Sequence, residues 1–227
     1  MASASPVSTL LSHPTAPALL HEGGFKLLNE LPGGTALCRM ILREALDAAA
    51  QAERQEHDTD VAEERGGAPA RRLFSSGGGD AQQALYSCRQ FLELLADTIG
   101  ADLHPSGPGG SYSYYTRPGD HLALHRDIVE CDVAAITCLC DAGGRGGSGA
   151  LQLYPSRIAD SLSAIRATPR RGRVAVHLRP GQTIVLLGGY VAHATAPVAA
   201  GQRRVISVLC YRGHCARREA AATHFAI

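Results

Sequence analysis

Lysine and tryptophan are the scarcest residues of this chain of 227 amino acids: Lys26 is the single lysine, and tryptophan is absent. A mechanism that needs a lysine Schiff base therefore has one candidate residue. The formal net charge is +1 at neutral pH, so no overall field attracts nucleic acid or an anionic membrane surface. No apolar run is long enough to span a bilayer, so we expect a globular protein outside the membrane.

Paired cysteine motifs are also lacking. The seven cysteines are scattered, and none belongs to a Cys-x-x-Cys pair, which argues against a disulfide framework or a zinc ribbon. We therefore expect reduced thiols, several of them buried. The N-terminus has no basic segment before its apolar residues, and prolines and His13 interrupt them, which is not typical of a signal peptide. These observations together predict a cytoplasmic protein.

The length suits one domain with one hydrophobic core, so we expect a single domain over residues 1–227. The residue composition and the apolar pattern change along the chain. A segment rich in Ser, Pro and Ala is followed by helical patterns and then by short β-rich runs. These changes predict a tail at 1–22, a helical region at 23–110, a β-rich core at 111–212 and a C-terminal segment at 213–227.

Two helices are predicted before residue 110, from apolar residues that recur at helical spacing. The first helix covers 35–55, and the second covers 80–100, with Asp80 as its N-cap and Gly100 after its end. Residues 56–80 between them form a long loop, which is either disordered or a mobile lid over a site.

After Gly110, short β-rich runs alternate with glycine and proline, and one helical pattern occurs at 157–166. Helices followed by a succession of strands predict a mainly β fold with a helical buttress on one side. The strands are predicted at 111–117, 132–140, 150–154, 174–177, 183–187 and 204–211.

His125, Asp127 and, much later, His193 are the candidate metal ligands. Residues i and i+2 of an extended segment point to the same side, so His125 and Asp127 can bind one ion. A third ligand from another strand completes one face of an octahedron and leaves three positions open. Two histidines and one carboxylate in this arrangement suit Fe(II) in non-haem oxygenases. A lone His-x-Asp is weak by itself and is more often an incidental surface pair.

Four ordered segments around these residues strengthen the case. The segment 115–127 begins with Tyr115 and ends in His125-Arg126-Asp127. It resembles the metal-binding segment of prolyl-4-hydroxylase-like Fe(II)/2-oxoglutarate dioxygenases. The segments 146–155, 178–187 and 193–207 are similar, in the same order, to a Gly-Gly-strand-Pro element, the strand before the distal histidine, and that histidine with its downstream basic strand. The resemblance covers residues 111–212.

The resemblance implies a double-stranded β-helix, the jelly-roll or cupin-like barrel, with N-terminal helices and with iron at its open end. His125, Asp127 and His193 would be the iron ligands and the catalytic residues. Arg203 would hold the distal carboxylate of 2-oxoglutarate, because a guanidinium can form a two-pronged ion pair. Arg204 is the competing candidate for that role, since neighbouring residues of a strand point to opposite faces. Ser207 and Tyr115 would contact the same co-substrate.

The implied reaction consumes 2-oxoglutarate and O2 with Fe(II) and yields succinate and CO2. The carboxylate at Asp127 favours hydroxylation, desaturation or cyclisation over halogenation. We expect a small-molecule substrate, an amino acid or natural-product intermediate, with His121, Arg126 and Tyr114 as candidate contacts. A peptidyl residue stays open as substrate, as do a cupin-like metalloenzyme without 2-oxoglutarate and a non-catalytic barrel. Nucleic-acid and membrane partners are not expected, and the oligomeric state is not predicted.

Overall fold

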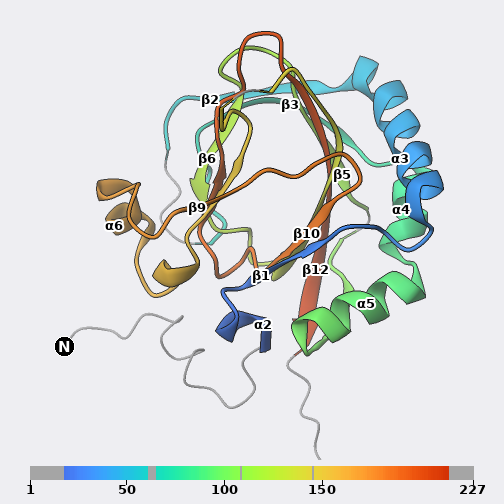
Figure 1. Ribbon diagram of the computed structural model, residues 1–227, viewed down its shortest axis with the longest axis horizontal. Coiled ribbons are helices and arrows are strands. Elements are labelled where there is room, and N and C mark those ends of the chain that lie inside the picture. Colours follow the sequence, from blue (N-terminus) through green and yellow to red (C-terminus); the bar gives the residue numbers. More distant parts are fainter. Residues whose placement is uncertain (1–17, 61–64, 108, 145, 215–227) are drawn as a thin grey trace, which may run out of the picture.

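A single curled sheet of twelve strands forms the body of the molecule (Figure 1). The computed structural model describes residues 18–60, 65–107, 109–144 and 146–214. The named strand pairs are antiparallel, and the sheet runs in the order β1-β10-β7-β12-β5-β3-β6-β11-β8-β9, with β2 paired to β3 and β4 to β12. Because non-consecutive strands are neighbours, residues far apart in the chain meet inside the curl.

The twelve strands are short at the two ends of the sheet order and longest in the middle. β7 and β12 are the longest, and they pair over most of their length. The bounds are β1 Phe25–Leu28, β2 Glu53–His57, β3 Arg71–Gly77, β4 Asp102–Pro105, β5 Ser111–Tyr115, β6 His121–His125, β7 Val133–Ala142, β8 Leu151–Leu153, β9 Val174–Val176, β10 Thr183–Leu186, β11 His193–Thr195 and β12 Arg203–His214.

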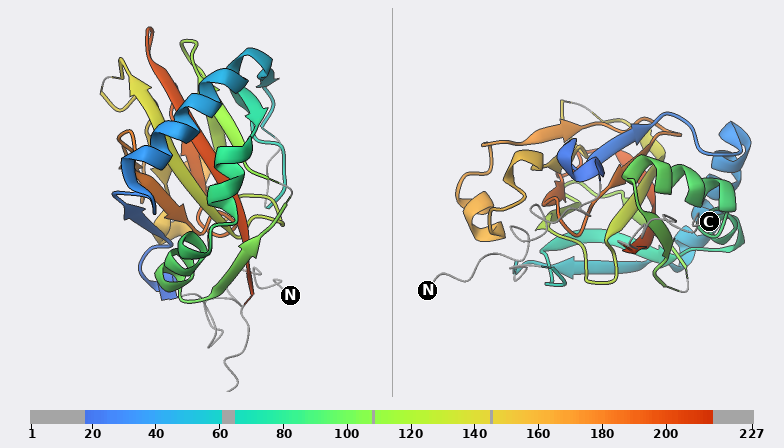
Figure 2. Two further views of the ribbon diagram at one scale, coloured as in Figure 1. Left: turned by 90° about the vertical axis from the view of Figure 1, so that its right-hand side faces the viewer. Right: turned by 90° about the horizontal axis from the view of Figure 1, so that it is seen from below.

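The helices lie outside the curl. In both views α3, α4 and α5 run along one outer face of the sheet, and α6 lies on the opposite side (Figures 1 and 2). α5 buries Phe91, Leu95 and Ile99 completely, each contributing about 2 kcal/mol of burial free energy. The helical bounds are α2 Ala18–His21, α3 Gly34–Ala48, the 3-10 turn η1 Ala49–Gln51, α4 Asp80–Tyr86, α5 Arg89–Ile99, η2 Pro155–Arg157 and α6 Leu162–Ala167.

Glu44 joins two of these helices. Its carboxylate, on α3, accepts hydrogen bonds from the backbone N–H groups of Gly79, Ala81 and Gln82, which form the first turn of α4. The hydroxyl of Tyr112, on β5, donates to the same carboxylate. Burial opposes ionisation of Glu44, but these donors outweigh it and lower its pKa. The glutamate thus replaces an N-cap side chain, which α4 lacks at Gly79.

The predicted β core and its helical buttress are confirmed, but the predicted helical region 23–110 is only partly correct. It also supplies four strands, β1 to β4, to the sheet. The first helix ends at Ala48 rather than near residue 55, and β2 and β3 pair as a hairpin inside the predicted loop 56–80 and its flanks. The second helix is broken between Tyr86 and Arg89 into α4 and α5. Its end at Gly100, which has a positive φ of 78°, is confirmed.

The expectation of reduced thiols is wrong for Cys131 and Cys210, which form a disulfide. Cys131 follows β6 in the loop that leads to β7, and Cys210 lies on β12. Their separation of 79 residues gave no local pattern by which the sequence could predict the bond. The remaining cysteines in the described residues, Cys38, Cys88, Cys138 and Cys140, are unpaired, as expected.

Among the residues described, no helix has the length and apolar character needed to cross a membrane.

Candidate metal centre

His125 and His193 come from two strands that pair directly. His125 is the last residue of β6, His193 is the first of β11, and the two face each other in the register of the ladder. Asp127 follows two residues after β6 and is held by a hydrogen bond of 2.8 Å from its backbone N–H to the carbonyl of Gly188. Antiparallel pairing therefore brings together residues that are 68 positions apart (193 − 125) in the chain.

The three side chains present one nitrogen or oxygen each to a common point. Ligand atoms of His125, Asp127 and His193 lie within 4.8 Å of one another, and within the described residues this is the one such group of metal-binding side chains. Each histidine Nδ1 lies 2.9 Å from a carbonyl of its own segment, Ala123 or Val191. A protonated Nδ1 donates to that carbonyl and leaves Nε2 with a free lone pair.

The electrostatics of the group favour a bound cation. The Nε2 atoms of His125 and His193 lie 3.5 and 3.6 Å from the same Asp127 oxygen. Burial raises the pKa of Asp127, but the two adjacent histidines, His193 above all, outweigh burial and hold it below its usual range. Burial and the neighbouring His193 lower the pKa of His125. Two buried rings around one carboxylate gain from sharing a divalent cation in place of a proton.

Glycine at position 188 makes room for the carboxylate. A Cβ atom there would lie 1.8 Å from Oδ2 of Asp127, a distance that no packed side chain tolerates. Gly188 precedes the segment that leads to His193, so the Gly188-Gly189 pair lets two ligand-bearing segments approach each other. The sequence showed this pair, but nothing in its neighbourhood indicated what it faces.

A cavity of about 70 Å³ adjoins the three ligands inside the curl. Arg204 of β12 lines it and is 3% exposed, and its Nη1 pairs with the carboxylate of Asp141. Its Nε–H is buried and has no hydrogen-bond partner among the described residues. Tyr115 and Thr195 line the same cavity. A buried guanidinium with a donor to spare is suited to an anionic ligand.

The structure places Arg203 and Ser207 on the face of β12 that points away from the cavity. Arg203 is exposed, and neither residue lines the cavity. The hydroxyl of Ser207 instead accepts a hydrogen bond of 2.7 Å from Gln82 of α4, on the helical side of the sheet. Arg204, Ile206 and Val208 are the residues of β12 that face the cavity. The alternation of the strand therefore favours Arg204, the competing candidate.

The predicted substrate contacts also point elsewhere. The guanidinium of Arg126 is buried and donates to the carbonyls of Tyr190, Ile158 and Asp160, so it ties loops together behind the metal ligands. Tyr114 donates to the carbonyl of Ala45 in α3. Neither side chain lines the cavity, and their role as substrate contacts stays a prediction.

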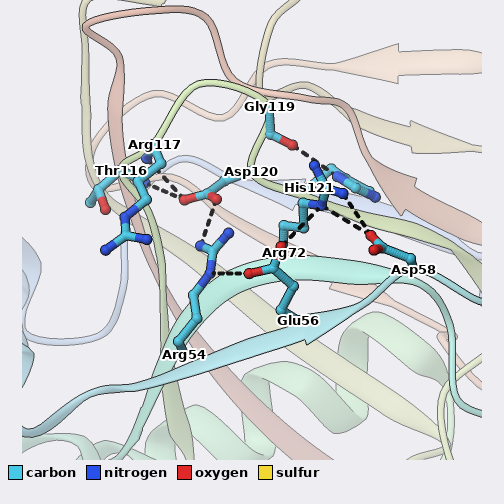
Figure 3. A network of polar contacts seen from close by, with 9 residues as sticks. All are labelled: Arg54, Glu56, Asp58, Arg72, Thr116, Arg117, Gly119, Asp120 and His121. Atoms are coloured by element: carbon cyan, nitrogen blue, oxygen red, sulfur yellow. Dashed lines mark hydrogen bonds and ion pairs between the residues drawn. The ribbon is translucent and has the colours of Figure 1, made fainter.

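His121 lies opposite Arg72 in the pairing of β6 with β3 and does not line the cavity. Figure 3 shows it in a polar network in which Arg72 pairs with Asp58 and Arg54 pairs with Asp120. The ring Nδ1 of His121 lies 2.9 Å from the carbonyl of Gly119. Its part in binding substrate stays a prediction.

Thr195 and Asp141 are site residues that sequence reasoning missed. Thr195 was detectable, because it lies two residues after His193 and shares its face of β11. Asp141 was not, because its link to Arg204 joins two strands that are far apart in the chain. Gln202 supports that link by donating to Asp141 at 2.9 Å.

No protein-family model and no curated protein sequence matches this chain. Solved structures do match it in fold. The α-ketoglutarate-dependent non-haem epimerase SnoN from nogalamycin biosynthesis aligns with a TM-score of 0.60 at 17% identity, over 86% of this chain and 83% of its own. A Pseudomonas putida prolyl-4-hydroxylase aligns with a TM-score of 0.54 at 18% identity, over 92% of this chain and 97% of its own. HygX of Streptomyces hygroscopicus, solved with nickel, 2-oxoglutarate and hygromycin B bound, aligns with a TM-score of 0.52 at 14% identity, over 85% of this chain and 84% of its own. The fold is thus the double-stranded β-helix predicted from the sequence.

Proposed function

We propose that this protein is a non-haem oxygenase that uses Fe(II), 2-oxoglutarate and O2 to oxidise a small molecule. The observation that carries the proposal is the pairing of two features in one cavity: the three ligands His125, Asp127 and His193, and the spare donor of Arg204. Iron with bound 2-oxoglutarate supplies a strong oxidant from dioxygen, with succinate and CO2 as co-products.

The residues present fit an iron ion. The hydrogen bonds at each Nδ1 orient the two imidazoles so that Nε2 faces the common point, and Asp127 is ionised there. Two neutral imidazoles and one carboxylate form the donor set that non-haem iron sites use. Supporting contacts of this kind keep the ligands in place before the ion binds, which raises its affinity.

Arg204 would bind the distal carboxylate of 2-oxoglutarate through its free Nε–H, with Tyr115 and Thr195 beside it. Asp141 holds the guanidinium in place from the other side. The rest of the lining includes Ala134, Ile136, Leu151, Ile206 and Val208, which are apolar and limit the entry of water.

Anaerobic titration of the Fe(II)-loaded protein with 2-oxoglutarate tests the proposal. We expect a charge-transfer absorption band in the visible region, succinate formation once oxygen is admitted, and loss of bound iron in His193→Ala. A protein that binds iron but never 2-oxoglutarate would instead be a cupin-like metalloenzyme of another kind. Metal content that is unchanged by His193→Ala would refute the iron site itself.

We further propose that the substrate is a free amino acid or a natural-product intermediate. The support is the fold shared with SnoN, an enzyme of nogalamycin biosynthesis, and with HygX, solved with hygromycin B. A mass-spectrometric screen for the gain of one oxygen or the loss of two hydrogens, with an amino-acid arm, a metabolite arm and a peptide arm, separates the alternatives. Turnover confined to the peptide arm would refute the small-molecule proposal.

The cytoplasmic location stays a prediction. The Cys131–Cys210 disulfide argues against it, because such bonds are rare in the reducing cytoplasm. Counting the free thiols of protein purified from its own cells under alkylating conditions tests whether the disulfide forms there, and with it the predicted location.

A further inference from the structure

Arg65 reaches from the connection between β2 and β3 to the loop that carries Asp127. All three nitrogens of its guanidinium donate hydrogen bonds to that loop. The acceptors are the carbonyl of Asp127 at 3.3 Å, that of Ile128 at 2.8 Å, that of Val129 at 3.2 Å, that of Cys131 at 3.0 Å and the carboxylate of Asp132 at 3.0 Å.

The other face of the same guanidinium lies against the segment that leads to His193. Its Cζ atom is 5.5 Å from the ring centroid of Tyr190. A Cβ atom on Gly189 would lie 2.6 Å from that Cζ, so glycine is what permits the contact. Arg65 therefore occupies the seam between the two segments that bring the carboxylate and the second histidine to the metal centre.

Apolar packing does not hold the middle of this loop. The side chains of Ile128 and Val129 are 52% and 55% exposed, so they gain little from burial. The loop is fixed at one end by the hydrogen bond from Asp127 to Gly188 and at the other by the disulfide of Cys131. Between these points several carbonyl oxygens converge, and carbonyl dipoles that point at one place repel each other unless a cation lies there.

We propose that Arg65 is a positioning residue of the metal centre: it holds the loop 127–132 in the conformation that brings Asp127 to His125 and His193. The proposal rests on the metal site of the proposed function. It also makes Arg65, from the connection between β2 and β3, part of the site, through contacts to the loop 127–132 rather than as a lid. Metal affinity then depends on a side chain that contacts no metal.

Titration of the purified protein with Co(II) alone, by calorimetry and by its visible absorption, tests the proposal. Replacing an orienting side chain around a metal site weakens affinity about 10- to 100-fold, and we expect a loss in that range for Arg65→Gln. Arg72→Gln is the matched control, because Arg72 lies on the adjoining strand β3, is exposed and pairs with Asp58. Its Co(II) affinity should stay within about twofold of the parent, as expected for an exposed ion pair.

Two further variants separate positioning from general stability. Gly189→Ala keeps Arg65 but pushes its flexible end away, so it should lower Co(II) affinity even if Arg65→Gln folds poorly. In an Asp127→Asn background, Arg65→Gln should cause no additional loss, because its effect passes through that carboxylate. Co(II) affinity within twofold of the parent for both Arg65→Gln and Gly189→Ala would overturn the proposal and leave the metal site intact. A parent protein that binds no Co(II) would overturn the metal site as well.

Discussion

Arg203 and Arg204 are adjacent arginines with opposite surroundings, and they provide a matched pair for testing the co-substrate pocket. Arg204 is buried in the cavity, whereas Arg203 is exposed on the other face of β12. If Arg204 binds a carboxylate of 2-oxoglutarate, Arg204→Met removes a hydrogen-bonded ion pair in a buried site. Arg203→Met removes a charge that water already screens.

The expected magnitudes differ widely. A hydrogen bond to a charged group contributes about 1.5–3 kcal/mol, and the buried setting of Arg204 favours the upper value. A loss of about 3 kcal/mol raises the dissociation constant for 2-oxoglutarate roughly 10²-fold. For Arg203→Met we expect a change below about twofold, since exposed charges contribute about 0–1 kcal/mol.

The assay is calorimetric titration of 2-oxoglutarate into anaerobic protein loaded with Fe(II). Because Arg204→Met leaves Asp141 as an unpaired carboxylate, the double variant Arg204→Met/Asp141→Asn is measured beside it. Iron binding by each variant shows that the site is still folded. Two results would refute the assignment of Arg204 as the residue that binds 2-oxoglutarate. One is a loss of 2-oxoglutarate affinity in Arg203→Met as large as in Arg204→Met, and the other is an unchanged affinity in both Arg204 variants.

Three other predictions follow from the contacts described above. Glu44→Gln should lower the free energy of unfolding by about 1.5–3 kcal/mol at pH 7, measured by urea denaturation. The pKa of Glu44 is lower in the folded than in the unfolded state, so its contribution to stability is fully present above the unfolded value of about 4.3 and is lost as the pH falls through the folded pKa. The free energies of unfolding of parent and variant should therefore converge in acid. A difference between them that persists in acid contradicts this account. Cys210→Ser should lower the free energy of unfolding by about 2–4 kcal/mol, because it removes the disulfide to Cys131 that closes a loop of the chain. If the parent protein shows the same number of free thiols before and after reduction, the disulfide is excluded. Gly188→Ala should abolish iron binding while the chain still folds, because its Cβ overlaps the position of the Asp127 carboxylate; iron content equal to the parent's would show that the loop can adjust.

The predicted strands of the β core were found because glycine or proline lies near most of their ends and because β-branched, aromatic or other apolar residues make up most of each run. The strands that were missed lack such a signal. β2 reads Glu-Arg-Gln-Glu-His, which is polar throughout, and it is a strand because it pairs with β3 at the edge of the sheet. β11 is three residues long, and its pairing to β6 and β8 defines it rather than its own composition.

The choice between Arg203 and Arg204 shows a different limit. A strand with one solvated face alternates polar and apolar residues, and the alternation identifies which residues point inward. β12 is covered on both sides, by the cavity on one and by α4 and α5 on the other, and residues 204–207 are all buried. Without alternation, a shift of one residue exchanges the two faces, and only the pairing with β5 and β7 decides between them.

His125 and Asp127 could be proposed as ligands from the chain itself, because their spacing of two is a property of neighbouring residues. His193 joined them as a candidate through the resemblance of its own segment, and the structure brings all three together. The mainly β class with a helical buttress followed from the order of the elements, and the barrel was what the resemblance of four ordered segments implied. The tertiary structure alone decided which arginine enters the cavity, that Cys131 joins Cys210, and that Arg65 closes the loop behind Asp127. Each of these joins segments more than 60 residues apart or depends on which face a strand presents, and packing of the whole sheet settles both.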